Sequence, residues 1–150
     1  MRNRSFRKRS YGEGMTTFRG FATMNIWADD VPAAADWYTE VLGVPSYFSR
    51  PGPDGRPAYV EFRVGDHQAE LGIIDRAWAP PGAPVAPGGA VTHWHVDDLE
   101  GTLARLLALG ATPYMPLTPR GAGFVTASVV DPFGNVLGIM TNPHYLEMLG

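Results

Sequence analysis

The chain has 150 residues, of which 45% are apolar and 18% are charged, so it can bury one core of ordinary domain size. It contains no cysteine, which excludes disulfides, thiolate nucleophiles and cysteine-ligated metals. No apolar run approaches the roughly 20 residues that cross a bilayer, and the first residues lack the apolar segment of a secretory signal. We therefore expect a cytoplasmic protein that makes no membrane contact.

The net charge of −3 is distributed unevenly along the chain. Residues 1–14 contain five basic side chains and one acidic side chain, whereas the rest of the chain contains seven basic and fourteen acidic ones. An acidic body argues against nucleic-acid binding and would attract a cationic compound. Because runs of like charge at a terminus are usually solvated, we expect residues 1–14 to be a disordered basic leader. Contact of this leader with phosphate is the alternative.

A repeat with an offset of 68 residues predicts two amphipathic helices. The first follows the aspartate pair at 29–30 and ends at Gly43, and the second follows the pair at 97–98 and ends at Gly110. In both, an aspartate can cap the helix N-terminus, apolar residues lie three or four positions apart, and a glycine stops the helix. Each helix should pack one apolar stripe on a sheet.

Segments rich in aromatic and β-branched residues surround each helix and are typical of strands. The predicted strands are 22–27, 46–49, 57–64 and 68–74 in the first half, and 91–96, 112–116, 123–130 and 135–141 in the second. The sequence therefore predicts an α+β fold of two βαβββ modules. The expected divisions are module 15–74, a Pro/Gly linker at 75–90, module 91–141 and a tail at 142–150. We expect this partly apolar tail to pack across a dimer or to cover the mouth of a cleft.

Alternation along the strands separates two faces of each sheet. The face expected to pack on the helices carries Met24, Ile26, Val60, Phe62, Val64, Leu71, Ile73, Val125, Ala127, Val129, Leu137 and Ile139. The opposite face carries Thr23, Asn25, Trp27, Tyr59, Glu61, Arg63, Glu70, Gly72, His93, His95, Phe124, Thr126, Ser128, Gly138 and Met140. Aromatic walls with a few polar groups are typical of ligand pockets, so we expect this second face to line a wet cavity. A face open to bulk water is the alternative.

Three segments carry a resemblance to a known family: DWYTEVLG at 36–43, WHVDDL at 94–99 and VDPFGNVL at 130–137. Together with the tandem βαβββ modules, they resemble the vicinal oxygen chelate superfamily, which includes glyoxalase I, bleomycin-resistance proteins and extradiol dioxygenases. The resemblance implies that the two mixed sheets roll into a cleft. It also implies a homodimer.

The resemblance further implies where a metal would be held, because enzymes of this superfamily take ligands from the first and last strands of each module. The corresponding positions here are Thr23, Glu70, Val91 and Gly138. Only Glu70 is a usual ligand, so we expect no metal and no other cofactor. The alternative is a replacement set of Glu70, His93 and His95, which would suit zinc or non-haem iron.

The favoured interpretation is a metal-free protein that resembles bleomycin-resistance proteins and binds a small organic molecule, a drug or a metabolite, in the cleft. The candidate ligand-binding residues are Thr23, Asn25, Trp27, Tyr59, Glu61, Arg63, His95, Phe124, Thr126 and Met140. The alternative is a lyase, isomerase or dioxygenase-type enzyme in which Glu70 and His93 are the candidate catalytic groups, with His95 as a further base or ligand. A plain surface ion pair is the competing explanation for Arg63 and the two glutamates. We expect a small molecule and a second copy of the chain as partners, and no nucleic acid.

Overall fold

The computed structural model describes residues 17–150, so the expectation for residues 1–14 lies outside the described part. The first module contains β1 (Thr23–Ala28), α1 (Val31–Leu42), β2 (Phe48–Pro51), β3 (Pro57–Val64) and β4 (Ala69–Asp75), followed by a short 3₁₀ helix, η1 (Arg76–Trp78). The second contains β5 (His93–His95), α2 (Leu99–Ala108), β6 (Thr112–Gly121), β7 (Phe124–Val130) and β8 (Val136–Thr141), followed by α3 (Pro143–Leu149). The predicted order of two βαβββ modules is confirmed.

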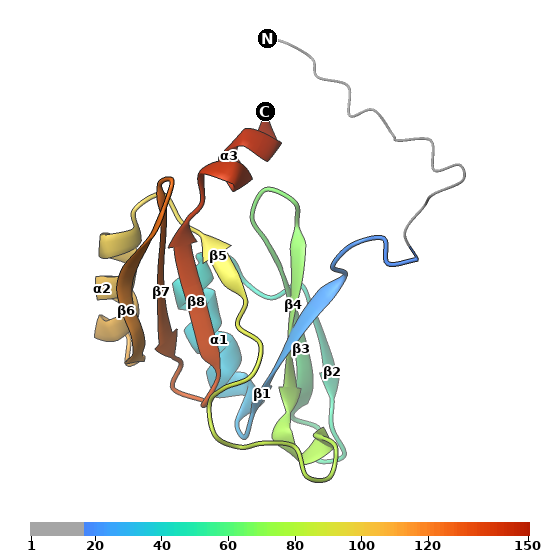
Figure 1. Cartoon of the computed structure of the whole chain (residues 1–150). Coiled ribbons are helices and arrows are strands. Elements are labelled where there is room, and N and C mark those ends of the chain that lie inside the picture. Colours follow the sequence, from blue (N-terminus) through green and yellow to red (C-terminus); the bar gives the residue numbers. More distant parts are fainter. Residues whose placement is uncertain (1–16) are drawn as a thin grey trace.

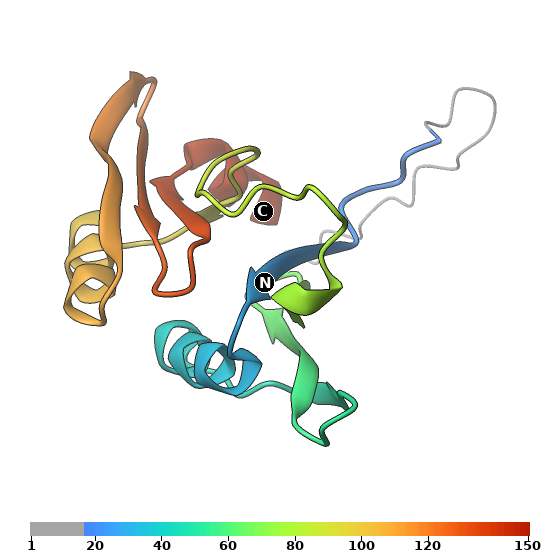
Figure 2. The ribbon, with the colours of Figure 1, turned by 90° about the horizontal axis from the view of Figure 1, so that it is seen from below.

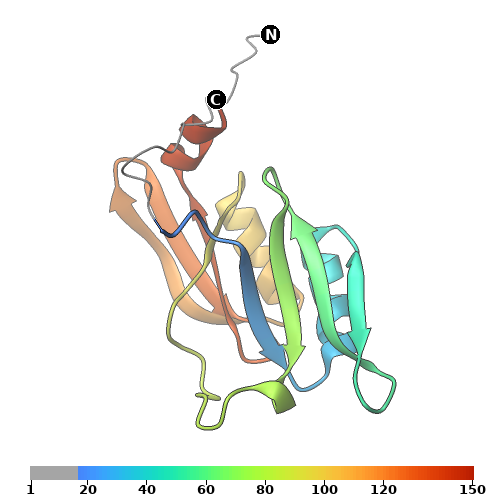
Figure 3. The ribbon, with the colours of Figure 1, turned by 90° about the vertical axis from the view of Figure 1, so that its right-hand side faces the viewer.

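Each module forms a four-stranded mixed sheet. Sheet A has the strand order β1-β4-β3-β2, and sheet B has the order β5-β8-β7-β6. In each sheet the first and last strands of the module are parallel neighbours, and the other pairs are antiparallel. The sheets lie beside one another without closing into a barrel, and β1 forms the edge of sheet A nearest to sheet B (Figure 3). Residues 79–92, between η1 and β5, contain neither helix nor strand (Figure 1).

The helices begin where the aspartate pairs predict. The Asp30 carboxylate accepts a hydrogen bond from the Ala33 N–H at 3.1 Å, and the Asp98 carboxylate accepts one from the Gly101 N–H at 3.0 Å. Gly43 ends α1 in the left-handed region, with φ of 72°, as C-terminal glycines of helices commonly do. No helix within residues 17–150 is long and apolar enough to cross a membrane.

The apolar core lies between the sheets and the helices and includes residues of both modules. Helix α1 packs on β1, β3 and β4, and α2 packs on β6, β7 and β8 (Figure 2). The predicted core face is at most 7% exposed at Val60, Phe62, Leu71, Ile73, Ala127, Val129, Leu137 and Ile139. Its other members, Met24, Ile26, Val64 and Val125, pack against this cluster while partly buried. The predicted core face is therefore confirmed, whereas Ser128, which was assigned to the opposite face, is also buried at 4% exposure.

The modules meet at a buried carboxylate, Asp131, in the turn between β7 and β8. Asp131 is 3% exposed and accepts a hydrogen bond from the Tyr38 hydroxyl of α1 at 2.5 Å. The backbone N–H groups of Phe133 and Asn135 donate to the same carboxylate at 2.8 and 2.9 Å. Burial, and then the Asp131 charge, raise the pKa of Tyr38 well above its ordinary value. The Tyr38 hydroxyl therefore keeps its proton and stays a donor.

Asn135 and Arg76 add further contacts between the DPFGN turn, residues 131–135, and the first module. The Asn135 side chain accepts from the Trp27 N–H at 3.2 Å and donates to the Trp27 carbonyl at 2.8 Å, so it pairs with the end of β1 as a neighbouring strand would. Arg76 donates to the Phe133 carbonyl at 2.8 Å and forms an ion pair with Asp29 at 3.1 Å. The DPFGN turn is thus one contact that positions the two sheets, and it acts together with hydrogen bonds from Trp37 to the Leu109 carbonyl and from Arg105 to the Glu40 carbonyl.

Removing either side of the central hydrogen bond should destabilise the protein, because the group left behind is buried and loses a partner: Asp131 keeps only its donors in the turn, and the Tyr38 hydroxyl has no other partner within residues 17–150. We expect Tyr38→Phe to lower the free energy of unfolding by about 1–3 kcal/mol and Asp131→Ala to lower it by more, about 3 kcal/mol or above. Urea unfolding followed by circular dichroism measures both values. Tyr114→Phe is the matched control, since Tyr114 is 44% exposed on β6 and should change stability by less than about 0.5 kcal/mol. Equal effects of the two tyrosine variants would contradict the assigned role of Asp131.

Candidate functional site

The face of sheet A that points away from α1 carries a connected set of polar and aromatic side chains. We call it the open face and define it by Thr23, Asn25, Tyr59, Glu61, Arg63 and Glu70. Arg63 and Glu70 are partners across β3 and β4, and their side chains form an ion pair at 3.1 Å. The Tyr59 hydroxyl donates to the Glu61 carboxylate at 2.7 Å. The structure therefore brings these six predicted site residues together on one surface.

Gly72 leaves room at the centre of the open face. It lies on β4 directly between Asn25 of β1 and Glu61 of β3. A Cβ atom at position 72 would lie 2.9 Å from the Tyr59 ring and would overlap the Asn25 side chain. A side chain at position 72 would have to displace Asn25 or Tyr59, so glycine is what leaves these two side chains in the space above the strand.

Two aromatic side chains of the β2 segment, which the sequence did not single out, extend the open face. The Arg63 guanidinium lies over the Tyr47 ring, 4.8 Å from its centroid. The Phe48 ring meets the Tyr59 ring edge-on, with 6.2 Å between centroids. Tyr47 and Phe48 are 48% and 40% exposed. The sequence carried no direct signal for them, because the β2–β3 register that places Phe48 opposite Glu61 is known only from the structure.

The Glu70 charge influences the protonation of two neighbouring groups on the open face, Glu61 and Tyr59. Partial burial and the nearby Glu70 charge raise the pKa of Glu61, and Arg63 opposes this shift. Partial burial and Glu70 also raise the pKa of Tyr59, and Arg50 opposes that shift. Tyr59 therefore remains a hydrogen-bond donor at neutral pH. Glu61 is a carboxylate that takes up a proton more readily than an isolated glutamate.

The predicted site residues of the second module do not join this surface as one cluster. His93 lies at the exposed start of β5, and its ring covers Gly138, where a Cβ atom would lie 2.8 Å from His93 Cδ2. The half-buried members of the predicted set near or on sheet B are Trp27, Phe124, Thr126 and Met140. Each is on the expected strand, but none forms a hydrogen bond, ion pair or ring contact with the Tyr59–Glu61 or Arg63–Glu70 pair.

His95 is enclosed at one end of the molecule by α3 and the segment before it. The Tyr145 ring stacks on the imidazole with 5.1 Å between centroids and 16° between planes. Nδ1 of His95 accepts a hydrogen bond from the Asn142 N–H at 3.1 Å, and Nε2 lies 3.3 Å from the Asp97 carboxylate. These partners require a lone pair on Nδ1 and a proton on Nε2. Only 8% of the His95 side chain is exposed, so it is not part of an open surface.

The strand register corrects one of the metal-ligand positions. Thr23 lies opposite Glu70 in the parallel β1–β4 pair, and the residue opposite Gly138 in the parallel β5–β8 pair is His93, not Val91. The alignment by helices was two residues off because His93 is six residues before the start of α2, whereas Thr23 is eight residues before the start of α1. The four positions are therefore occupied by Thr, Glu, His and Gly.

These residues do not fit a metal ion of the type that the superfamily's enzymes hold. Gly138 has no ligand atom, and the Glu70 carboxylate is already paired with the Arg63 guanidinium. In the part of the chain that the structure describes, no three His, Asp or Glu side chains are grouped so that they could hold a metal. Glu70, His93 and His95 accordingly do not assemble into the alternative set.

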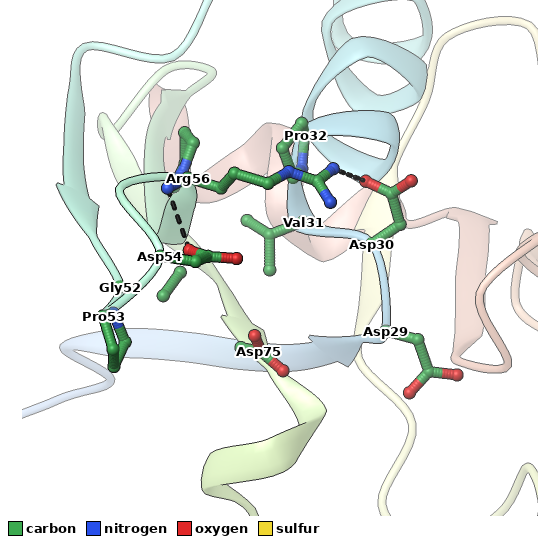
Figure 4. Close-up of a pocket in the computed structure, with 11 residues that line it drawn as sticks. Asp29, Asp30, Val31, Pro32, Gly52, Pro53, Asp54, Arg56 and Asp75 are labelled. Carbon is green, nitrogen blue, oxygen red and sulfur yellow. Dashed lines mark hydrogen bonds and ion pairs between the residues drawn. The ribbon is translucent and has the colours of Figure 1, made fainter.

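A cavity of about 280 Å³ lies elsewhere, near the start of α1 and the turn between β2 and β3 (Figure 4). Its lining includes Asp29, Asp30, Asp54 and Asp75, together with Arg56. The carboxylates already have structural partners. Asp30 and Asp75 cap α1 and η1, Asp54 accepts from the Arg56 N–H at 2.9 Å, and Asp29 pairs with Arg76. This cavity is therefore explained by turn and cap formation and lies apart from the open face.

Residues 20–139 match the profile of the Glyoxalase/Bleomycin resistance protein/Dioxygenase superfamily. The chain belongs to this superfamily. An uncharacterized protein of Mycobacterium bovis is 27% identical over 111 residues, which cover 71% of this chain and 73% of that protein. Two uncharacterized proteins of Mycobacterium tuberculosis have the same identity, and the match spans 65% of their length.

Solved structures of the superfamily share the fold of this chain. A glyoxalase-related enzyme from Fulvimarina pelagi has a TM-score of 0.65 at 20% identity, with 84% of this chain and 90% of that one covered. A superfamily member from Sphaerobacter thermophilus has a TM-score of 0.65 at 20% identity, with 85% and 100% covered. At such identities the likeness concerns the fold and not the activity.

The charges around Glu61 can be tested by titration. We expect Arg63→Gln to raise the pKa of Glu61, because a neighbouring cation is lost, and Glu70→Gln to lower it, because a neighbouring anion is lost. Carbon-detected NMR of the glutamate carboxyl groups between about pH 3 and 8 follows the change. If neither variant moved the Glu61 titration, the two side chains would not be coupled to it as the structure indicates.

Proposed function

We propose that this superfamily member binds a small organic molecule on the open face of sheet A and that it does so without a metal ion. The observation that carries the proposal is the Tyr59–Glu61 hydrogen bond beside the Arg63–Glu70 ion pair, next to the exposed rings of Tyr47 and Phe48. Aromatic area with a few oriented polar groups is the usual composition of a small-molecule site. The competing explanation, a plain surface ion pair, accounts for Arg63 and Glu70 but not for the clustered aromatic rings.

The chemistry of the face suggests the kind of ligand. A flat apolar body would pack on the aromatic rings, which gain from burial of their surface. The Glu61 carboxylate uses Oε1 for Tyr59, so its other oxygen can accept a hydrogen bond from a protonated nitrogen of the ligand. The acidic charge of the chain beyond residue 14 would favour the approach of such a cation.

A metal-independent lyase or isomerase is the second candidate. Its support is the raised pKa of Glu61, since a carboxyl group titrating closer to neutral pH serves better as a general base or acid. Glu70, which the sequence favoured for this role, is held by Arg63, and His95 lies beneath Tyr145. Glu61 therefore replaces Glu70 and His95 as a candidate proton-transfer group, while His93, exposed at the start of β5, stays a candidate.

A thermal-shift screen of small aromatic amines, run with and without EDTA, tests the proposal. We expect compounds that raise the melting temperature equally in both conditions. Tyr59→Ala should then weaken binding of such a compound, measured by calorimetry, by about tenfold or more, which is roughly 1.4 kcal/mol. Glu61→Gln should weaken binding of the amine but have a smaller effect on its uncharged analogue. Tyr114→Ala, an exposed tyrosine outside the face, is the control.

Three results would contradict parts of this account. Loss of binding in EDTA would show that a metal is required. Unchanged affinity in both open-face variants would show that the ligand binds elsewhere. Chemical conversion of a bound compound that Glu61→Gln slows by about 10²–10⁴ would favour the enzyme, since this is the usual effect of removing a general base.

A further inference from the structure

Helix α3 is attached to the rest of the protein by few contacts. It spans Pro143–Leu149 and contains no buried residue, and its members from position 146 onward are exposed. It projects from the end of β8, at the opposite end of the molecule from η1 (Figure 1). An isolated helix of seven residues is not stable in water, so α3 depends on its tertiary contacts.

Tyr145 supplies the contacts that hold α3 across both modules. Its ring stacks on His95 of sheet B at 5.1 Å, and its hydroxyl donates to the Asp66 carboxylate at 2.7 Å, in the turn between β3 and β4 of sheet A. His67 of the same turn meets the ring edge-on at 6.1 Å. The hydrogen bond to Asp66 is exposed, so water can compete for both groups when it breaks.

The same turn adjoins the open face. Arg63 and Glu70 form the second residue pair from the Gly65–Gln68 turn, after Val64 and Ala69. A ligand that extends along the open face toward this end would therefore approach Tyr145, with His95 beneath it. In the structure, Tyr145 of α3 covers the His95 imidazole, so such a ligand cannot reach it.

We propose that α3 is a lid over His95, latched by the hydrogen bond from Tyr145 to Asp66, and that local opening of the lid makes His95 accessible. The effect of the lid on ligand access rests on the proposed function, but the existence of the lid does not. Short elements with few buried contacts open at low free energy, well below that of global unfolding. Opening frees the face of the His95 ring and, when Asn142 moves with α3, its Nδ1 acceptor.

Diethyl pyrocarbonate, which reacts with accessible neutral imidazoles, tests the lid without any ligand. The rate of carbethoxylation at His95 is measured by mass spectrometry of peptides, with exposed His93 and His144 as internal references. In the parent protein His95 should react more slowly than both. Tyr145→Phe removes only the hydroxyl, and Asp66→Ala removes its acceptor; each should accelerate His95 modification by about three- to tenfold, because one weak hydrogen bond is lost.

Two controls separate the latch from a general loss of stability. Tyr114→Phe makes the same chemical change on β6, and Met148→Ala changes an exposed residue of α3 itself. Neither variant should alter the rate of His95 modification by more than about twofold. The rate of His93 modification should be the same in all variants. Unchanged His95 rates in both latch variants would overturn the lid. Failure of the amine screen would remove the proposed function but would leave the His95 result standing.

Discussion

The carboxylate of Asp131 is buried between the modules, where an unpaired charge would be costly, so its position depends on the donors that surround it. Those donors come from α1, through Tyr38, and from the turn itself, through Phe133 and Asn135. The Asn135 side chain in turn forms hydrogen bonds with both the N–H and the carbonyl of Trp27, near the end of β1. This hydrogen-bond network therefore links the helix of the first module to the last strands of the second, and hydrogen bonds from Trp37 to the Leu109 carbonyl and from Arg105 to the Glu40 carbonyl join the same two modules near the helices.

This arrangement leaves the other face of each sheet available for function. On sheet A, Gly72 leaves space over β4 for the side chains of Asn25 and Tyr59. Arg63 forms an ion pair with Glu70, and the Tyr59 hydroxyl donates a hydrogen bond to Glu61. The polar groups are thus paired with one another before any ligand arrives, which reduces the ordering cost of binding. The far end of this sheet reaches the turn that Tyr145 contacts, and the β7–β8 turn and the C-terminal helix lie at opposite ends of the molecule (Figure 1).

The sequence predicted the fold and the division of the sheet faces because a period of two places alternate residues on opposite sides regardless of tertiary context. The sequence could not show which residues become neighbours through strand pairing or through packing of distant segments. The two-residue difference before the helices moved the third ligand position from Val91 to His93, and a residue 50 positions away, Tyr145, covers His95. Asp131 entered the sequence analysis only as part of the VDPFGNVL segment, because burial of a carboxylate depends on a partner, Tyr38, that lies far away in sequence. The homodimer and the cytoplasmic location stay predictions.

The central claim, that ligands bind to the open face of sheet A, is tested most directly by NMR mapping of a bound amine from the thermal-shift screen. In isotopically labelled protein, the account predicts the largest shift changes, and contacts from ligand protons, at Asn25, Tyr59, Glu61, Arg63 and Gly72. Shift changes concentrated instead around the aspartate-lined cavity, at Asp29, Asp30, Asp54 and Asp75, would contradict it.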